Sequence, residues 1–114
     1  MAYGRRARFE ELRQLAFGSI GAGYVAVGAG TQYYTRIASI FNSTDVDIHF
    51  SLDGATTQIR LAPSSGQIFD FTANEVRDDG LFIPEGTIFW AKEVAGAPTK
   101  GAVWVEICYA DGGV

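Results

Sequence analysis

The sequence contains very little cysteine and histidine. Its 114 residues include one cysteine, Cys108, and one histidine, His49. A single thiol cannot form a disulfide within the chain, so nothing in the sequence asks for an oxidising compartment. A single histidine cannot build a histidine-rich metal site and has no obvious partner for nucleophilic catalysis. We therefore expect a protein that is not an enzyme and uses no metal or cofactor, with Cys108 buried as a small apolar group and His49 solvated.

Long apolar runs are also missing. No segment reaches the roughly 18–20 unbroken apolar residues that cross a membrane. Residues 15–29 follow several arginines, as the apolar part of a signal peptide would, but Glu10 and Glu11 intervene and glycines interrupt the run. We interpret this stretch as part of the fold, and we expect the protein in the cytoplasm or in a particle assembled there.

Basic residues are scarcer than acidic ones and are unevenly placed. The chain has 9 lysines and arginines against 13 acidic residues, a net charge of −4. Residues 1–13 hold four arginines and two glutamates, a net charge of +2, which leaves −6 for the rest. Because an acidic body repels nucleic acid, we expect the basic segment to dock on an acidic neighbouring protein, with phosphate contact as the alternative.

The clearest pattern in the chain is that of a strand. Apolar and polar residues alternate between positions 45 and 53. A period of two indicates a half-buried antiparallel strand. Asp53-Gly54 is a strong signal for a hairpin turn, and residues 58–62 return with the same alternation, so we expect the two segments to pair. The side chains expected to face the core are Val46, Ile48, Phe50 and Leu52.

Three aspartates near this strand raise the question of a calcium site. Asp45 and Asp47 lie on the expected strand and Asp53 in its turn, and no EF-hand-like loop ending in glutamate follows. We therefore interpret them as solvated residues, with calcium as the less favoured alternative.

Further short strands follow from similar patterns. Turn signals separate them every 8–12 residues or so, which is typical of a sandwich or jelly roll. The sequence thus predicts an all-β fold, a small antiparallel β-sandwich or jelly roll, with strands over more than roughly 40% of the chain. Besides the hairpin, the expected strands are residues 24–27, 33–41, 67–71, 81–83, 87–93 and 102–109. The expected loops are residues 73–80 and 95–101.

The N-terminal segment differs from the rest. Residues 1–8 suggest a short arm, and residues 9–17 have apolar positions close to helical spacing, which predicts one or two helical turns. We therefore divide the chain into an N-terminal arm and glycine-rich segment, residues 1–30, and a sandwich body, residues 31–110. Apolar residues that a compact body leaves uncovered mark a contact surface, and those expected to be uncovered here are Phe9, Leu12, Leu15, Phe17 and Ile20. The predicted protein-interface residues are Arg5, Arg6, Arg8, Phe9, Leu12, Arg13 and Phe17.

One tryptophan offers a different function. In the expected strand 102–109, Trp104 shares a face with Glu106 and Cys108. We expect Trp104 to pack in the core or at an interface, with sugar binding by an exposed aromatic ring beside a carboxylate as the less favoured alternative.

Several phrases, taken in order, resemble a known group of proteins. They are FEELRQLAFGSI at residues 9–20, YVAVG at 24–28, IFNSTD at 40–45, FSLDG at 50–54, IFDFTAN at 68–74, PEGT at 84–87 and GAVWVEI at 101–107. Together they resemble small virion structural proteins of tailed bacteriophages.

That resemblance implies a β-sandwich that repeats on a virion assembled in the host cytoplasm. It is expected either as a capsid decoration (cement) protein or as a head–tail joining (neck) protein. The implied partners are the major capsid protein or portal and neck proteins, with other copies of the chain; neither a membrane nor nucleic acid is expected. The competing hypothesis is a carbohydrate-binding module of a tail fibre or spike.

Overall fold

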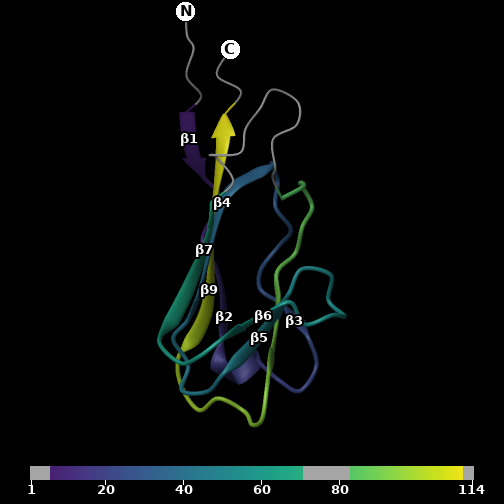
Figure 1. The fold of residues 1–114 in the computed structure, drawn as a ribbon, viewed down its shortest axis with the longest axis vertical. Helices are drawn as coiled ribbons and strands as arrows, with labels where there is room; N and C mark the ends of the chain where they lie inside the picture. The colour runs from purple at the N-terminus through teal and green to yellow at the C-terminus, as the bar shows by residue number, and fades with distance from the viewer. Residues whose placement is uncertain (1–5, 71–82, 112–114) are drawn as a thin grey trace, which may run out of the picture.

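The chain folds as two antiparallel β-sheets packed face to face (Figure 1). The computed structural model describes residues 6–70 and 83–111. A large sheet has the strand order β1-β9-β4-β7, with β2 also paired to β9, and a small sheet has the order β3-β8-β5-β6. About half of the described residues lie in strands. The prediction of a small antiparallel β-sandwich is confirmed.

The strands and the single helical turn have the following bounds. The large sheet contains β1 (Arg6–Phe9), β2 (Arg13–Ala16), β4 (Thr35–Asn42), β7 (Ser65–Asp70) and β9 (Ala102–Asp111). The small sheet contains β3 (Val25–Ala26), β5 (Ile48–Ser51), β6 (Ile59–Leu61) and β8 (Trp90–Glu93). A short 3-10 turn, η1, covers Phe17–Ser19.

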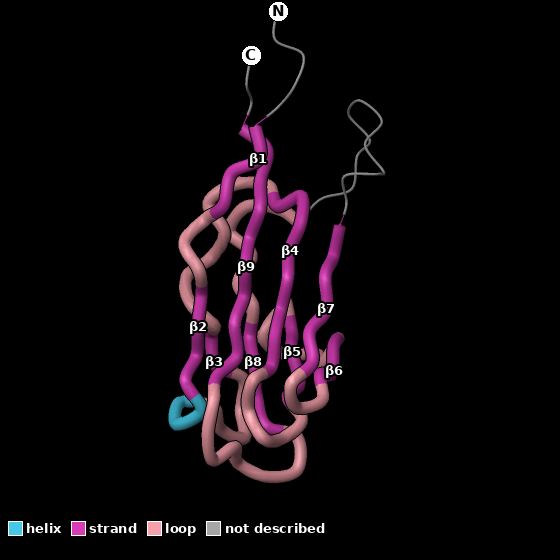
Figure 2. The backbone as a smooth tube through the Cα atoms, turned by 90° about the vertical axis from the view of Figure 1, so that its left-hand side faces the viewer, coloured by secondary structure: helices cyan, strands magenta, loops and turns pink. Residues whose placement is uncertain are grey.

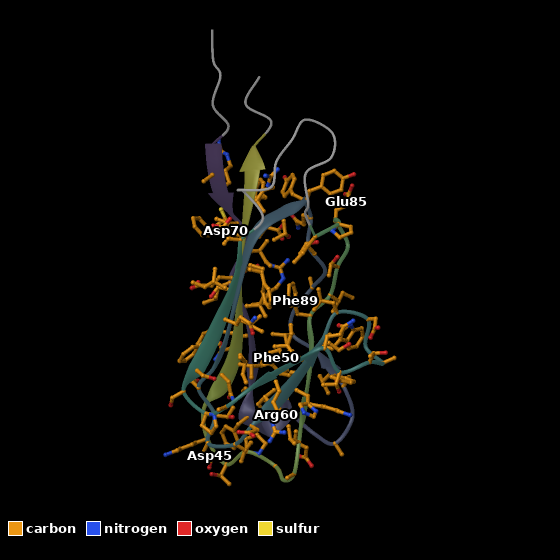
Figure 3. The ribbon with its side chains drawn as sticks, viewed as in Figure 1. Asp45, Phe50, Arg60, Asp70, Glu85 and Phe89 are labelled. Atoms are coloured by element: carbon orange, nitrogen blue, oxygen red, sulfur yellow. The ribbon has the colours of Figure 1, made fainter. Side chains whose placement is uncertain are left out.

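The hydrophobic core fills the space between the two sheets. Ile48 and Phe50 are fully buried, and Val46 and Leu52 pack against the core from its margin. Phe50 and Phe89 point into the space between the layers (Figure 3). Burying side chains of this size contributes about 1.5–3 kcal/mol each, so this layer is a main source of stability. The predicted core face of residues 45–53 is confirmed.

The predicted hairpin pairing is confirmed, but its turn is wider than expected. β5 pairs with β6 in antiparallel register, and residues 52–58 connect them. The Oδ1 atom of Asp53 accepts hydrogen bonds from the backbone N–H groups of Ala55 and Thr56, each at 2.8 Å. The Ser51 hydroxyl also accepts one from the Gly54 N–H at 3.0 Å. Side-chain oxygens that satisfy loop backbone in this way favour a wide loop over a two-residue turn.

The predicted helical turns at residues 9–17 are wrong. β1 pairs with the end of β9 and β2 with its beginning, while only η1 is helical. A helix this short is marginal in water, whereas the open edge of β9 offers backbone hydrogen bonds along its whole length. Farther along the N-terminal segment, Ile20 and Val27 belong to the core, so the expectation that Ile20 is left uncovered is wrong. The described part of residues 1–30 is therefore built into both sheets and is not a free arm.

The chain crosses from the large to the small sheet at a corner held by Asn42, the last residue of β4. The Asn42 side chain is fully buried, and its Nδ2 donates to the carbonyl oxygens of Val46, Leu61 and Ala62 at 2.8, 3.1 and 3.2 Å. Its Oδ1 accepts from the backbone N–H of Thr44 at 2.9 Å. The phrase IFNSTD therefore has a structural role at a sheet-to-sheet corner.

Two expectations fall largely outside the described residues. The loop at residues 73–80 and the first two residues of the strand at 81–83 belong to this part of the sequence. Ile83 itself forms a single antiparallel bridge with Thr35, at the start of β4.

Candidate interaction surface

The outer face of the large sheet brings side chains from four strands together. Figure 2 is a view from this side of the molecule. Phe41 of β4 lies opposite Trp104 of β9, and Ser39 lies opposite Glu106. On the other side of β4, Ser39 is opposite Ile68 of β7. The sheet register thus places apolar and polar side chains in cross-strand rows on one surface.

This face exposes large apolar side chains. Phe9 is 72% exposed, Leu12 50%, Phe41 41% and Ile68 69%. The strand neighbours of Phe41, Ile40 and Asn42, are fully buried, because successive side chains of a strand alternate between its faces. Exposed apolar residues that adjoin one another mark contact surfaces more often than scattered ones do. We call the surface formed by Phe9, Leu12, Phe41, Ile68 and Trp104 the outer apolar face.

A shallow hollow lies within the outer apolar face. It has a volume of about 350 Å³ and is lined by Leu12, Ser39, Phe41, Trp104 and Glu106. The indole Nε1 of Trp104 donates to the Ser43 hydroxyl at 3.2 Å, which fixes the orientation of the ring. The hollow therefore combines an oriented aromatic surface with one hydroxyl and one carboxylate.

Two of the predicted interface residues, Phe9 and Leu12, belong to the outer apolar face. Phe17 lies in η1 and is 40% exposed. Arg8 is an exposed residue of β1, and the backbone of Arg6 pairs opposite Asp111. Arg5 lies outside the described residues.

Arg13 is placed differently from the expectation, because it is only 8% exposed. Its Nε donates to the carbonyl of Ala29 at 2.9 Å, and its Nη2 donates to the carbonyl of Gly30 at 3.1 Å and to Glu10 Oε1 at 2.7 Å. Glu10 in turn accepts from the backbone N–H of Gln32. The guanidinium therefore fastens β2 to the loop at residues 28–32. One of the four arginines in residues 1–13 is thus buried in the fold and is not presented to a partner.

Phe41 and Ile68 are the members of the face that sequence reasoning missed. Both lie in strands with apolar residues on two sides, such as Ile40 and Phe41. Such a run is equally typical of a strand buried on both faces. The sequence alone cannot decide which face of β4 and β7 another layer covers.

The three aspartates considered as calcium ligands each make a different interaction within the fold. Asp45 accepts from the backbone N–H of Thr99 at 2.9 Å and Asp47 pairs with Arg60, while Asp53 caps its own loop. Hydrogen bonds from Thr99 lower the pKa of Asp45, and those from Thr56 and Ala55 lower the pKa of Asp53 to about 2. Within residues 6–70 and 83–111, no three acidic, histidine or cysteine side chains are grouped as metal ligands.

The outer face of the small sheet carries a row of basic side chains. In the strand register, His49 of β5 lies between Arg60 of β6 and Lys92 of β8. Arg60 Nε donates to Asp47 Oδ2 at 3.0 Å, and Lys92 Nζ lies 4.7 Å from the centre of the Tyr24 ring. We call Arg60, His49 and Lys92 the basic row.

His49 is less solvated than expected. Burial, followed by the nearby charges of Arg60 and Lys92, lowers its pKa, while Asp47 opposes that shift. Its Nδ1 is buried and forms no hydrogen bond with the described residues. The side chain is therefore neutral over a wider pH range than a solvated histidine.

Cys108 is 7% exposed and lies on the outward-facing side of β9, opposite Phe9 and Ile37. Burial raises the pKa of its thiol, which keeps the thiol in its unreactive protonated form. The prediction that Cys108 packs as a small apolar group is confirmed.

No family model, curated protein or solved structure matches this chain. The described residues also include no helix with the length and hydrophobicity needed to span a membrane.

Proposed function

We propose that this chain is a non-enzymatic structural protein of a tailed-phage virion, in the role of capsid decoration or head–tail joining. It binds neighbouring capsid or neck proteins and stabilises the particle. The observation that carries the proposal is the outer apolar face, which exposes Phe9 at 72% and Ile68 at 69%. The ordered sequence phrases that resemble such virion proteins give the proposal its biological setting.

The size of the large sheet is compatible with a stable protein contact. β9 has 10 residues. At about 3.3 Å per residue it is about 33 Å long, and four strands about 4.8 Å apart add a width of about 19 Å. The resulting surface of about 600 Å² approaches the roughly 800 Å² that each partner buries in a standard interface. Covering the exposed aromatic and aliphatic side chains provides the driving force for association.

Particle incorporation tests the proposal. We expect Phe9→Ser combined with Ile68→Ser to fold but to be lost from purified particles, because the substitutions remove apolar contacts without touching the core. Tyr34→Ser is the control, since Tyr34 is 54% exposed, lies just before β4 and is not one of the residues that form the face. Quantitative mass spectrometry of particles measures the copy number of each variant.

The copy number of the wild-type chain also separates the two structural roles. Hundreds of copies per particle indicate decoration, whereas about six to twelve indicate a neck ring, because closed rings and shells impose their symmetry on the number of subunits. Absence of the chain from particles, or normal incorporation of the double variant, would contradict the proposal.

A second candidate function is carbohydrate binding, as in a tail fibre or spike. The specific observation in its favour is the hollow that places Trp104 beside Phe41, with Ser39 and Glu106 as polar groups. Aromatic rings stack on the apolar faces of sugars, and a few fixed polar groups orient the ligand.

The two tryptophans of the chain allow a direct test of carbohydrate binding. If the hollow binds a sugar, we expect a glycan array to identify that sugar. Adding the sugar to the protein then changes the tryptophan fluorescence, and Trp104→Ala abolishes binding. Trp90→Phe is the matched control, because Trp90 lies in the small sheet. Arrays that identify no sugar, or binding that is unchanged in Trp104→Ala, would contradict carbohydrate binding in the hollow and leave protein binding as the only proposed role.

A further inference from the structure

One charged group, Glu106, lies in the hollow of the outer apolar face, where a protein partner has to match it. Glu106 is exposed, lines the hollow beside Phe41 and Trp104, and has no hydrogen bond or ion pair with another described residue. A partner that covers this face removes water from the carboxylate. Desolvating an unpaired carboxylate is costly, so the partner has to bring a cation to this position.

The opposite side of the sandwich offers such cations. In the basic row, Asp47 already neutralises Arg60 through an ion pair of 2.5 Å. Lys92 lies over the Tyr24 ring and has no carboxylate partner among the described residues. The long aliphatic stems of lysine and arginine can cover apolar surface while their charged ends pair with a carboxylate.

A two-fold dimer through the outer apolar face fits these charges less well. Each copy would bring another Glu106 to the contact, and like charges brought together in an interface disfavour it. The two faces of one sandwich are instead complementary to each other.

We propose that copies of this chain associate head to tail, with the outer apolar face of one copy on the outer face of the small sheet of the next. Glu106 of one copy then pairs with Lys92 of its neighbour. The inference rests on the proposed function, because it names another copy of the chain as one of the bound neighbours. A contact between two different faces builds rings or filaments, the arrangements that repeating particle proteins use.

Charge reversal tests the pairing on the full chain. Sedimentation velocity up to about millimolar concentration measures self-association, since a contact of this kind is expected to be weak. We expect Glu106→Lys and Lys92→Glu each to weaken association roughly tenfold or more, because each places like charges together. Combining both substitutions in one chain restores attraction, as does mixing the two single variants in equal amounts. Glu85→Lys and Lys100→Glu change the net charge equally at exposed positions outside both faces and leave association unchanged.

The single histidine provides an independent readout. His49 adjoins Lys92 in the register, so its ring signals in a nuclear magnetic resonance spectrum report on the basic row. We expect its pKa to be higher in the associated wild type than in Glu106→Lys, because an approaching carboxylate favours the protonated ring.

Three outcomes of the association measurements would contradict the head-to-tail contact. A chain that stays monomeric at all concentrations, or a double variant that fails to recover association, excludes the head-to-tail contact. Association that Lys92→Glu leaves unchanged, and that is stronger in an equal mixture of Glu106→Lys and wild type than in either protein alone, shows a two-fold contact between outer apolar faces instead. Particle incorporation of Phe9→Ser/Ile68→Ser is a separate measurement, so the proposed function can stand when this inference fails.

Discussion

Phe50 and Phe9 place the same residue type in opposite environments. Phe50 is fully buried between the sheets, while Phe9 is 72% exposed on the outer apolar face. We expect Phe50→Ala to lower the free energy of unfolding by about 3–5 kcal/mol, the usual loss for a buried phenylalanine. Phe9→Ala is expected to cost less than about 1 kcal/mol, as at other exposed positions. Urea denaturation measures both, and equal losses would mean that the assignment of the two faces is wrong.

The titration of His49 makes the stability of the folded protein depend on pH. Burial and two nearby cations hold its pKa below the usual 6.5 in the folded protein. The unfolded chain therefore takes up the proton first as the pH falls, so this group destabilises the fold progressively below about pH 6.5 and has no such effect above it. We expect the stability of wild type relative to His49→Gln to fall between about pH 7 and pH 5. A pH-independent difference in urea melts at low protein concentration would contradict this assignment.

At the scale of elements, the corner after β4 depends on the chemistry of one amide. The Nδ2 of Asn42 donates to three carbonyl oxygens from β6 and the loops beside it, while the Oδ1 accepts from Thr44. Asparagine alone among residues of this shape offers both donors and an acceptor at neutral pH. The corner therefore couples the end of the large sheet to the edge of the small one.

Two substitutions of Asn42 separate the loss of hydrogen bonds from the gain of repulsion. Asn42→Ala leaves buried carbonyl oxygens without a donor, which costs about 1–3 kcal/mol for each group left unsatisfied. Asn42→Asp keeps the shape but turns an anionic oxygen towards those carbonyls, so we expect it to be the more destabilising of the two at pH 7. Thermal melts at pH 7 measure the difference, and an Asn42→Asp protein as stable as wild type would show that the amide is not needed.

At the scale of the whole molecule, β9 organises the large sheet. It pairs with β4 along one edge and with β1 and β2 along the other. β1 and β2 thus close an edge that would otherwise expose unpaired backbone groups, which invite aggregation.

Deleting residues 2–17 tests this organisation. The truncated protein loses β1, β2 and the buried Arg13, so we expect it to melt at a much lower temperature or to aggregate. Phe9→Ser/Ile68→Ser is the control, since it changes the outer apolar face but keeps both strands. Circular dichroism during heating measures the outcome, and an unchanged melting temperature of the truncated protein would show that the segment is dispensable for folding.

Local sequence patterns predict the fold class, the pairing of β5 with β6 and the core positions around Phe50. These follow from local rules, because the alternation of side chains along a strand is visible within a few residues. Phe9 and Leu12 were also identified from the sequence as exposed, although as parts of a helical arm.

Only the tertiary structure decided where the N-terminal segment lies and which sheet faces are covered. The N-terminal segment forms β1 and β2 because the distant β9 offers them an edge, and no local pattern contains that information. Arg13 is buried because the carbonyls of Ala29 and Gly30 surround its guanidinium. Phe41 and Ile68 are exposed because no further layer packs on the outer side of the large sheet among the described residues. Burial depends on contacts between segments far apart in the chain, and the outer apolar face is therefore a property of the assembled sandwich.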